Sequence, residues 1–250
     1  MSATILITGG TGVLGSRVVP LLQDKGYALR VLSRHTRDST DGVEYVACDL
    51  LKDEGIDRAV AGVEIILHLA GSTKGDDVAT RNLVAAAQRA GVRHMVYISV
   101  IGADKVPLAW FRSKRGAEQA IVDSGIEWTI LRAAQFHELT LKTIAMMAKM
   151  PIVPAPGVRM QPVDSGDVAA RIAELTLAAP AGLVADIAGP TEYAMADLIR
   201  GYLHATGKRR PILSFGMPGK AGKAYRAGDN LALADATIGH GTWEDFLATH

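Results

Sequence analysis

Glycines at positions 9, 12 and 15 follow an apolar run with the spacing G-x-x-G-x-x-G. Small residues let a backbone approach a phosphate closely, and a helix that starts there offers unpaired N–H groups to the anion. A helical pattern does follow, with an expected apolar face of Val13, Leu14, Val18, Leu21 and Leu22. Strand, turn and helix predict a site for the diphosphate of a dinucleotide; the alternative is a purely structural turn. The residues expected to contact it are Gly9, Thr11, Gly12, Val13, Leu14 and Gly15.

The predicted second strand, residues 28–33, ends at Ser33 and is followed by Arg34. The adenosine ribose of a bound dinucleotide lies beside this strand end, where a carboxylate selects NAD and an arginine pairs with the 2′-phosphate of NADP. No Asp or Glu occurs between Gly26 and Arg37. We therefore expect NADP(H) as the cofactor, held in part by Ser33 and Arg34. The alternative is that Arg34 and Arg37 are solvated loop charges.

Asp49 and Leu50 follow a third predicted strand, residues 43–47, and are also expected at the cofactor. An aspartate past a strand end can accept a hydrogen bond from the adenine amino group. It can equally cap the weak helix predicted at residues 56–60.

The fourth predicted strand, residues 64–69, is nearly all apolar, as a buried parallel strand should be. It leads into Ala70 and Gly71, small residues against which a flat ring of the cofactor could lie. His68 within this strand is expected to be a packed histidine rather than a catalyst.

Ser99 ends a fifth predicted strand, residues 94–99, and Lys114 lies on the helix predicted at residues 108–124. Chemistry in open α/β sheets takes place at the carboxyl ends of the strands. Ser99 and Lys114 are therefore the candidate catalytic residues, and Lys114 is also a candidate cofactor ligand.

Strand and helix patterns alternate six times up to the strand predicted at residues 127–132. One of these helices is predicted at residues 76–90, and the side that faces the sheet is expected to include Val78. This alternation predicts an α/β fold with a doubly wound parallel sheet of the dinucleotide-binding (Rossmann) kind. We expect the core at residues 1–134 and a smaller mixed α/β lobe at residues 135–250, the two interwoven as one structural unit.

The pattern loosens in the second half, where the lobe is expected to form a substrate pocket. Its predicted elements are a helix at 136–149, a loop or strand pair at 151–162, a helix at 168–178 capped by Asp164, a strand at 184–187, a helix at 195–205, an irregular glycine-rich stretch at 216–230 and a short helix at 243–247. The candidate pocket residues are Trp110, Phe136, His137 and Met146. His137 could serve as a proton donor, although a polar residue at a helix start is the commoner role.

The composition and charge of the chain argue against several classes of partner and site. The net charge of +1 gives no electrostatic reason to expect nucleic acid or membrane partners. The single cysteine, Cys48, cannot form an internal disulfide, which suggests a reducing compartment. No basic region precedes the first apolar run, so this run is not expected to be a signal peptide. No apolar run approaches the ~20 residues that span a bilayer. Scattered histidines predict no metal site. We expect a cytoplasmic monomer or homodimer that acts on a small molecule.

Taken together, the chain resembles the atypical short-chain dehydrogenase/reductase proteins, in particular the NmrA-like NAD(P)H-binding family. The matching segments are residues 8–15, Arg34, residues 81–92, residues 97–99, Lys114 with Glu118, residues 124–132, and residues 161–164 before 167–169. Reductases of the wider superfamily use a Ser, a Tyr and a Lys, with Tyr-x-x-x-Lys on one helix. The resemblance implies that Ser99 and Lys114 are in register with this set, whereas Trp110 replaces the tyrosine, and an indole cannot act as the acid.

The sequence leaves three hypotheses for the function. The first is an NADPH-dependent reductase of a small apolar carbonyl, quinone or activated alkene, since such acceptors need mainly a positioned nicotinamide. The second is a non-catalytic NADP(H)-binding redox sensor, which the missing tyrosine favours. The third, a DNA-acting regulator, is disfavoured because the charge is balanced and no helix-turn-helix is visible.

Overall fold

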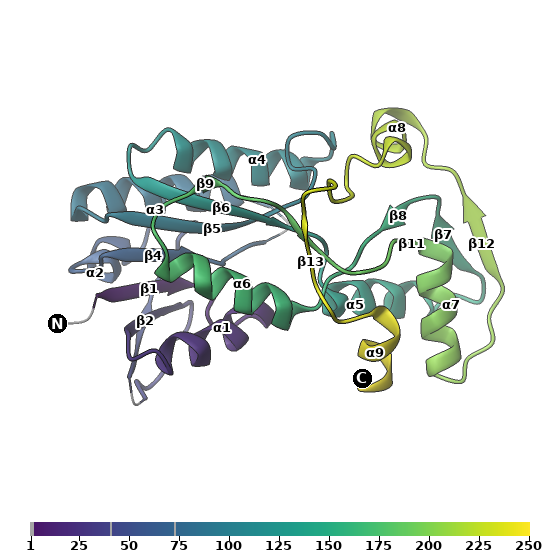
Figure 1. The fold of residues 1–250 in the computed structure, drawn as a ribbon, viewed down its shortest axis with the longest axis horizontal. Coiled ribbons are helices and arrows are strands. Elements are labelled where there is room, and N and C mark those ends of the chain that lie inside the picture. The colour runs from purple at the N-terminus through teal and green to yellow at the C-terminus, as the bar shows by residue number, and fades with distance from the viewer. Residues whose placement is uncertain (1–2, 41, 73) are drawn as a thin grey trace. The chain divides into compact units, whose positions relative to one another are not determined.

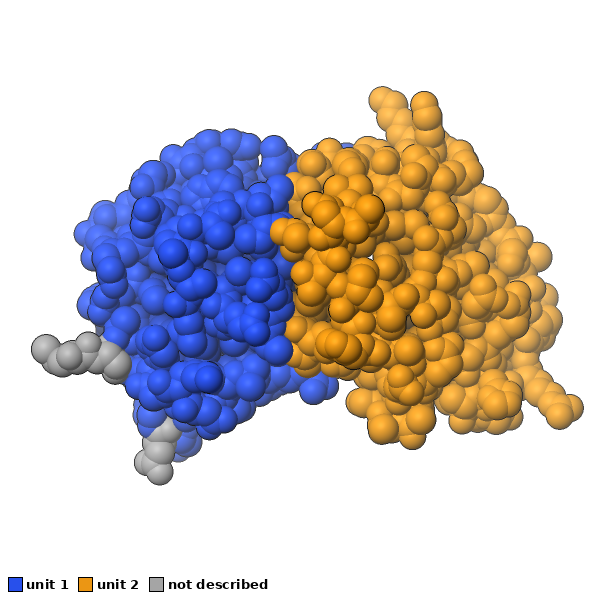
Figure 2. Space-filling view, in the orientation of Figure 1, with its two compact units in different colours: residues 1–99, 109–131, 169–184 blue, residues 100–108, 132–168, 185–250 orange. Residues whose placement is uncertain are grey.

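The computed structural model describes residues 3–40, 42–72 and 74–250, which fall into two compact units (Figure 2). Unit 1 consists of residues 1–99, 109–131 and 169–184, and unit 2 of residues 100–108, 132–168 and 185–250. Each unit is therefore built from three separate segments of the chain.

Unit 1 is built on a parallel sheet with the strand order β3-β2-β1-β4-β5-β6 (Figure 1). Its strands are β1 Thr4–Thr8, β2 Ala28–Ser33, β3 Val43–Ala47, β4 Ile65–His68, β5 His94–Val100, β6 Glu127–Ala133 and the short β9 Gly182–Leu183, which pairs with β6. The order reverses at β1, whose two neighbours are β2 and β4. This reversal is the topological switch point at which such sheets bind ligands, so the predicted α/β fold is confirmed.

Helices cover this sheet. They are α1 Val13–Gln23, α2 Ile56–Val60, α3 Asp76–Ala90, α4 Ala109–Val122 and α6 Ser165–Leu177, whose first residues belong to unit 2. Side chains of α2, α3 and α4 share one hydrophobic core with alternate residues of the strands, among them Leu6 and Leu32. The intervening residues Ile7 and Val31 face the other side, where both lie against Gly10. The strands are thus apolar on both faces, as a covered parallel sheet requires.

Two expected helix faces are wrong in part. Val13 and Leu21 of α1 are 46% and 39% exposed, and Val78 of α3 is 38% exposed. The buried residues of α1 are Leu14, Gly15, Val18 and Leu22. Each helix lies on the sheet along a narrower stripe than the sequence pattern indicates, because side chains at its edges and first turn face solvent.

Unit 2 contains the remaining elements. They are α5 His137–Met147, β7 Val153–Pro156, β8 Arg159–Met160, β10 Ile187–Ala188, β11 Tyr193–Ala194, α7 Met195–Ala205, β12 Ile212–Phe215, α8 Gly219–Ala227, β13 Thr237–Ile238 and α9 Trp243–Ala248. A second hydrophobic core joins α5, β7, α7 and α9 around Trp243, which is 1% exposed. β10 pairs with Ala133, the last residue of β6, and with β13.

Several expectations for this half are wrong. The residues expected as a loop or short strand pair, 151–162, do hold two short strands, β7 and β8, but these pair with β12 and β11 rather than with each other. The strand expected at 184–187 is β10, which begins only at Ile187. The stretch 216–230 is not irregular, because it contains the nine-residue helix α8. Asp164 does cap α6, accepting hydrogen bonds from the N–H groups of Gly166 and Asp167, although the helix begins at Ser165 rather than near Val168.

Candidate active site

The glycine turn between β1 and α1 has no room for a side chain at Gly9 or Gly15. Gly9 adopts a φ of +68°, and a Cβ atom on it would lie 2.7 Å from the Ala70 nitrogen. A Cβ atom on Gly15 would lie 2.3 Å from the Gly9 carbonyl oxygen. Only glycine can therefore occupy these two positions without moving the turn.

The start of α1 is open to a ligand. Thr11, Gly12 and Val13 are exposed, and no side chain caps the helix at Gly12. The first N–H groups of a helix without a side-chain cap, together with its dipole, suit an anion. A tight turn that leaves this helix start uncovered fits the diphosphate of a dinucleotide.

The other candidate cofactor residues of unit 1 lie at neighbouring strand ends. Ser33, the last residue of β2, pairs with Ala47 of β3, and its carbonyl oxygen accepts the Cys48 N–H at 2.9 Å. Arg34 follows Ser33 and is exposed. Since β2 lies beside β1, Arg34 follows the strand end next to the glycine turn, which is compatible with the predicted role at NADP(H).

Asp49 does not cap α2, so that expected alternative is wrong. Its Oδ1 atom accepts hydrogen bonds from the N–H groups of Leu51 and Lys52 at 3.0 and 3.2 Å. The N-cap residue of α2 is Gly55, and no side chain caps this helix. The Leu50 carbonyl oxygen accepts a hydrogen bond from Asn82 Nδ2 at 2.8 Å. These bonds fix the loop after β3, and the Leu50 side chain packs against the core of unit 1.

A buried chain of hydrogen bonds ties the end of β4 to the glycine turn. The Thr8 hydroxyl accepts the N–H groups of Leu69 and Ala70 at 3.1 and 3.0 Å and lies 2.7 Å from His68 Nδ1. On its other side, His68 Nε2 lies 2.9 Å from Thr80 Oγ1, which donates its own proton to the Asp76 carbonyl. Thr80 therefore accepts from Nε2–H, and Nδ1 accepts from Thr8, so this network assigns a neutral histidine.

His68 is thus the packed histidine that the sequence predicts. Burial, with Lys114 adding to it and Asp76 opposing it, lowers the pKa of His68 to about 3. The folded state keeps this ring neutral, while the unfolded chain binds a proton near the ordinary pKa of about 6.5.

This shift predicts an acid-sensitive fold. Between about pH 6.5 and pH 3 the unfolded state binds more protons than the folded one, so the contribution of His68 falls by up to about 1.4 kcal/mol per pH unit as pH drops. Chemical unfolding at several pH values would measure this slope. In His68→Gln, which keeps hydrogen-bonding groups, the slope should be shallower over that range; an unchanged slope would contradict the assignment.

Lys114 lies beside Gly71, against which the sequence analysis predicts a flat ring of the cofactor. Its Nζ atom forms a buried ion pair with Asp76 Oδ2 at 2.9 Å, and a Cβ atom on Gly71 would be only 3.0 Å from it. The other carboxylate oxygen of Asp76 accepts the Ser72 N–H at 2.6 Å. Asp76 therefore links the lysine of α4 to the small-residue loop after β4.

The hydroxyl groups of Ser99 and Tyr97, on strand β5, are the next groups to consider as proton donors, and both are buried. Ser99 donates to Glu118 Oε1 at 2.6 Å. Tyr97 is fully buried, with the Lys114 ammonium 5.4 Å from its ring centroid. Burial first, and then the charges of Asp76 and Glu118, raise the pKa of Tyr97 well above its usual range. The enclosed Tyr97 side chain is therefore poorly placed to give a proton to a bound substrate.

The candidate pocket residues belong to both units. Trp110 of unit 1 is half-buried and packs edge-on against Phe111. In unit 2, Phe136 is half-buried and Met146 is 63% exposed. Their assignment to one pocket stays a prediction.

His137 is enclosed by aromatic rings of unit 2. It is 1% exposed, and its ring centroid lies 5.9 Å from that of Trp243 and 5.2 Å from that of Phe246. Burial, opposed by nearby carboxylates including Asp164, lowers the pKa of His137. This environment fits a packed residue at the start of a helix, the commoner role expected for it.

Sequence reasoning did not identify Thr8, Asp76 or Tyr97 as parts of the site. A signal did exist for Asp76, because an aspartate follows the small residues at the end of β4 and opens α3. Within residues 3–40, 42–72 and 74–250, no group of three or more His, Cys, Asp or Glu could hold a metal ion. Nor does any helix in those ranges have the length and apolarity needed to cross a membrane.

Comparison with known proteins decides the family. The profile of a family described as NAD(P)H-binding matches residues 9–177. The chain belongs to this NAD(P)H-binding family. That assignment confirms the resemblance inferred from the glycine turn and the later motifs.

Members and structural neighbours of the family include several reductases. A (4-alkanoyl-5-oxo-2,5-dihydrofuran-3-yl)methyl phosphate reductase of Streptomyces griseus is 34% identical over 74% of this chain and 68% of its own. Quinone oxidoreductase 2 of Escherichia coli is 27% identical over 94% of this chain and 87% of its own. The fold matches an NADPH-dependent quinone oxidoreductase from Escherichia coli, solved with NADPH, with a TM-score of 0.79, 21% identity and coverage of 98% and 99%. These relatives support an NAD(P)H-dependent oxidoreductase.

Proposed function

We propose that the protein is an NADPH-dependent reductase of a small apolar carbonyl, quinone or activated alkene. The observation that carries this proposal is the placement of Lys114 beside Gly71, at the strand end next to the glycine turn. A dinucleotide whose diphosphate lies on that turn would extend its nicotinamide along these strand ends. The relatives named as reductases support the same reaction class.

Each candidate residue would have a distinct role in this reduction. Gly9, Gly12 and Gly15 would hold the diphosphate, and the reduced nicotinamide would supply the hydride. Lys114, oriented by Asp76, would hold the nicotinamide ribose and stabilise negative charge on the acceptor oxygen. Water or the Lys114 ammonium would provide the proton, because Trp110 carries no acid and Tyr97 is enclosed. Quinones and enones suit this arrangement, since their reduced forms are weaker bases than a simple alkoxide.

Cofactor selectivity tests the role of Arg34. Arg34→Ala should weaken NADPH binding about 10- to 100-fold, the range for losing a charge-assisted bond to phosphate, and should leave NADH nearly unchanged. Calorimetric titrations with both coenzymes would measure this. Arg37→Ala is the matched control, being exposed and three residues further along. Equal losses for NADPH and NADH in Arg34→Ala would contradict the assignment.

The activity itself is tested by NADPH oxidation against a panel of quinones, enones, ketones and aldehydes. We expect turnover with at least one quinone or enone and little with unactivated ketones. NADPH binding without reduction of any acceptor would overturn the proposed reaction.

That result would favour a second candidate function, a non-catalytic NADP(H)-binding sensor. The observation that favours it is Trp110 at the position where reductases of the wider superfamily place the tyrosine. A sensor should change its protection from proteolysis or its association with a partner between NADP⁺ and NADPH. A reductase need not do so.

A further inference from the structure

Positive charge is concentrated in one part of unit 2. Residues 198–228 contain seven Lys and Arg and no Asp or Glu, which leaves 20 Lys and Arg against 26 Asp and Glu in the rest of the chain. The net charge of +1 therefore averages over two regions of opposite sign. These seven residues are Arg200, Lys208, Arg209, Arg210, Lys220, Lys223 and Arg226, and all are exposed.

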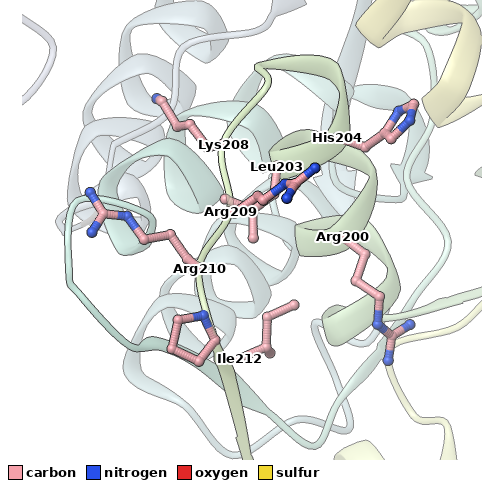
Figure 3. A pocket seen from close by; sticks show the side chains of 8 residues that line it. Arg200, Leu203, His204, Lys208, Arg209, Arg210 and Ile212 are labelled. Carbon is pink, nitrogen blue, oxygen red and sulfur yellow. The ribbon is translucent and has the colours of Figure 1, made fainter.

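The basic residues lie before and after strand β12. Arg200, Arg209 and Arg210 line a shallow pocket of about 510 Å³ between α7 and the start of β12, and Figure 3 shows Arg200 and Arg210 extending to opposite sides with Arg209 between them. Arg200 pairs with Asp197, one turn before it. Lys220, Lys223 and Arg226 lie on α8, which follows β12. Within the described ranges, Arg209, Arg210, Lys220 and Lys223 take part in no ion pair.

Between them, the two-stranded sheet of β7 and β12 has an apolar outer face. Val153 and Ala155 of β7 are buried in the unit 2 core, so the alternate residues of the strand point away from it. These are Pro154 and Pro156, which pair with Leu213 and Phe215 of β12. Leu213 and Phe215 are 60% and 46% exposed, and Ile152, just before β7, is 53% exposed.

We propose that this face, formed by Ile152, Leu213 and Phe215 between Arg209 and Arg210 before β12 and Lys220 and Lys223 on α8, docks the protein on an anionic lipid surface. Cations near an anionic bilayer gain electrostatic energy, and exposed aliphatic and aromatic side chains enter the headgroup region. Neither contribution alone gives firm attachment, whereas the two together do. A nucleic acid would use the cations but offers no apolar layer for Leu213 and Phe215.

Sedimentation of the full chain with vesicles tests the proposal. We expect binding to phosphatidylcholine vesicles that contain about 30% phosphatidylglycerol and none to pure phosphatidylcholine. Raising the salt from about 0.1 M to about 1 M should release most of the protein, since the Debye length falls from about 10 to about 3 Å. No binding to anionic vesicles, or equal binding to neutral ones, would overturn the proposal.

Two variants separate the contributions of charge and apolar contact. Arg209→Ala/Arg210→Ala should weaken vesicle binding by about 20-fold, and Leu213→Ser/Phe215→Ser by about 10-fold. The matched controls, Lys25→Ala/Arg58→Ala and Leu233→Ser, change exposed residues elsewhere and should bind like the wild type. NADPH binding and thermal unfolding report whether each variant is folded.

Soluble polyanions decide between lipid and other acidic partners. If polyglutamate or duplex DNA binds as tightly as the vesicles, and Leu213→Ser/Phe215→Ser changes neither, the surface recognises charge alone and the lipid assignment is wrong. Loss of vesicle binding in the apolar variant, with polyanion binding unchanged, would support it.

Discussion

Replacing Lys114 by Met should lower the turnover of NADPH with its best acceptor by about 100-fold or more, the range for losing a charged group that acts in the transition state. The lysine carries the ammonium nearest to Gly71, and methionine keeps its length without its charge. Initial rates at saturating NADPH would measure the effect.

The single variant also leaves the Asp76 carboxylate buried without its partner. An uncompensated buried charge costs about 3–5 kcal/mol, so Lys114→Met should unfold at lower temperature. The double variant Lys114→Met/Asp76→Asn removes both charges and should recover much of that stability, while its turnover stays low. If turnover recovers together with stability, Lys114 acts only through the fold and has no role in the reaction.

Replacing Gly15 by Ala should weaken NADPH binding by about 100-fold, although alanine is the better helix former by about 1 kcal/mol. Steric overlap outweighs the gain in helix propensity, because the added methyl group would lie 2.3 Å from the Gly9 oxygen and 2.4 Å from the Gly10 Cα. The turn must shift, and with it the N–H groups that face the diphosphate. Calorimetric titration with NADPH would measure the loss.

The matched control for this change is Gly216→Ala. A Cβ atom at Gly216 meets nothing within 4 Å, and its φ lies outside the left-handed region. Gly216→Ala should therefore bind NADPH like the wild type. Normal binding by Gly15→Ala would show that the turn does not have the geometry described.

The sheet of unit 1 could be predicted because its signals are local. The strands from β1 to β6 are short segments rich in apolar residues, so the order of elements and the elements that carry Ser33, Ser99 and Lys114 followed from the sequence. The side of each helix that faces solvent could not be predicted as well. Val13 and Leu21 are apolar yet exposed, because burial depends on how α1 lies across the sheet.

Helix α8 and the Asp76 ion pair were missed for different physical reasons. Glycine-rich sequence suggests irregular structure, but Gly222 lies inside α8 because a Cβ atom there would be 1.8 Å from the Met217 carbonyl oxygen. This glycine lets the segment before α8 pack closely against a regular helix. Asp76 opens α3, where an acidic residue is common for helix stability alone. Its contact with Lys114 depends on α3 and α4 lying side by side, which no local pattern encodes.

Calorimetric titration of the purified wild-type protein with NADPH and NADH tests the central claim most directly, namely that the first turn of the chain binds the diphosphate of NADPH beside Arg34. We expect one site per chain, with micromolar NADPH affinity and NADH at least about tenfold weaker, given the worth of a phosphate–arginine pair. Absence of heat from both coenzymes, or tighter binding of NADH, would contradict the account.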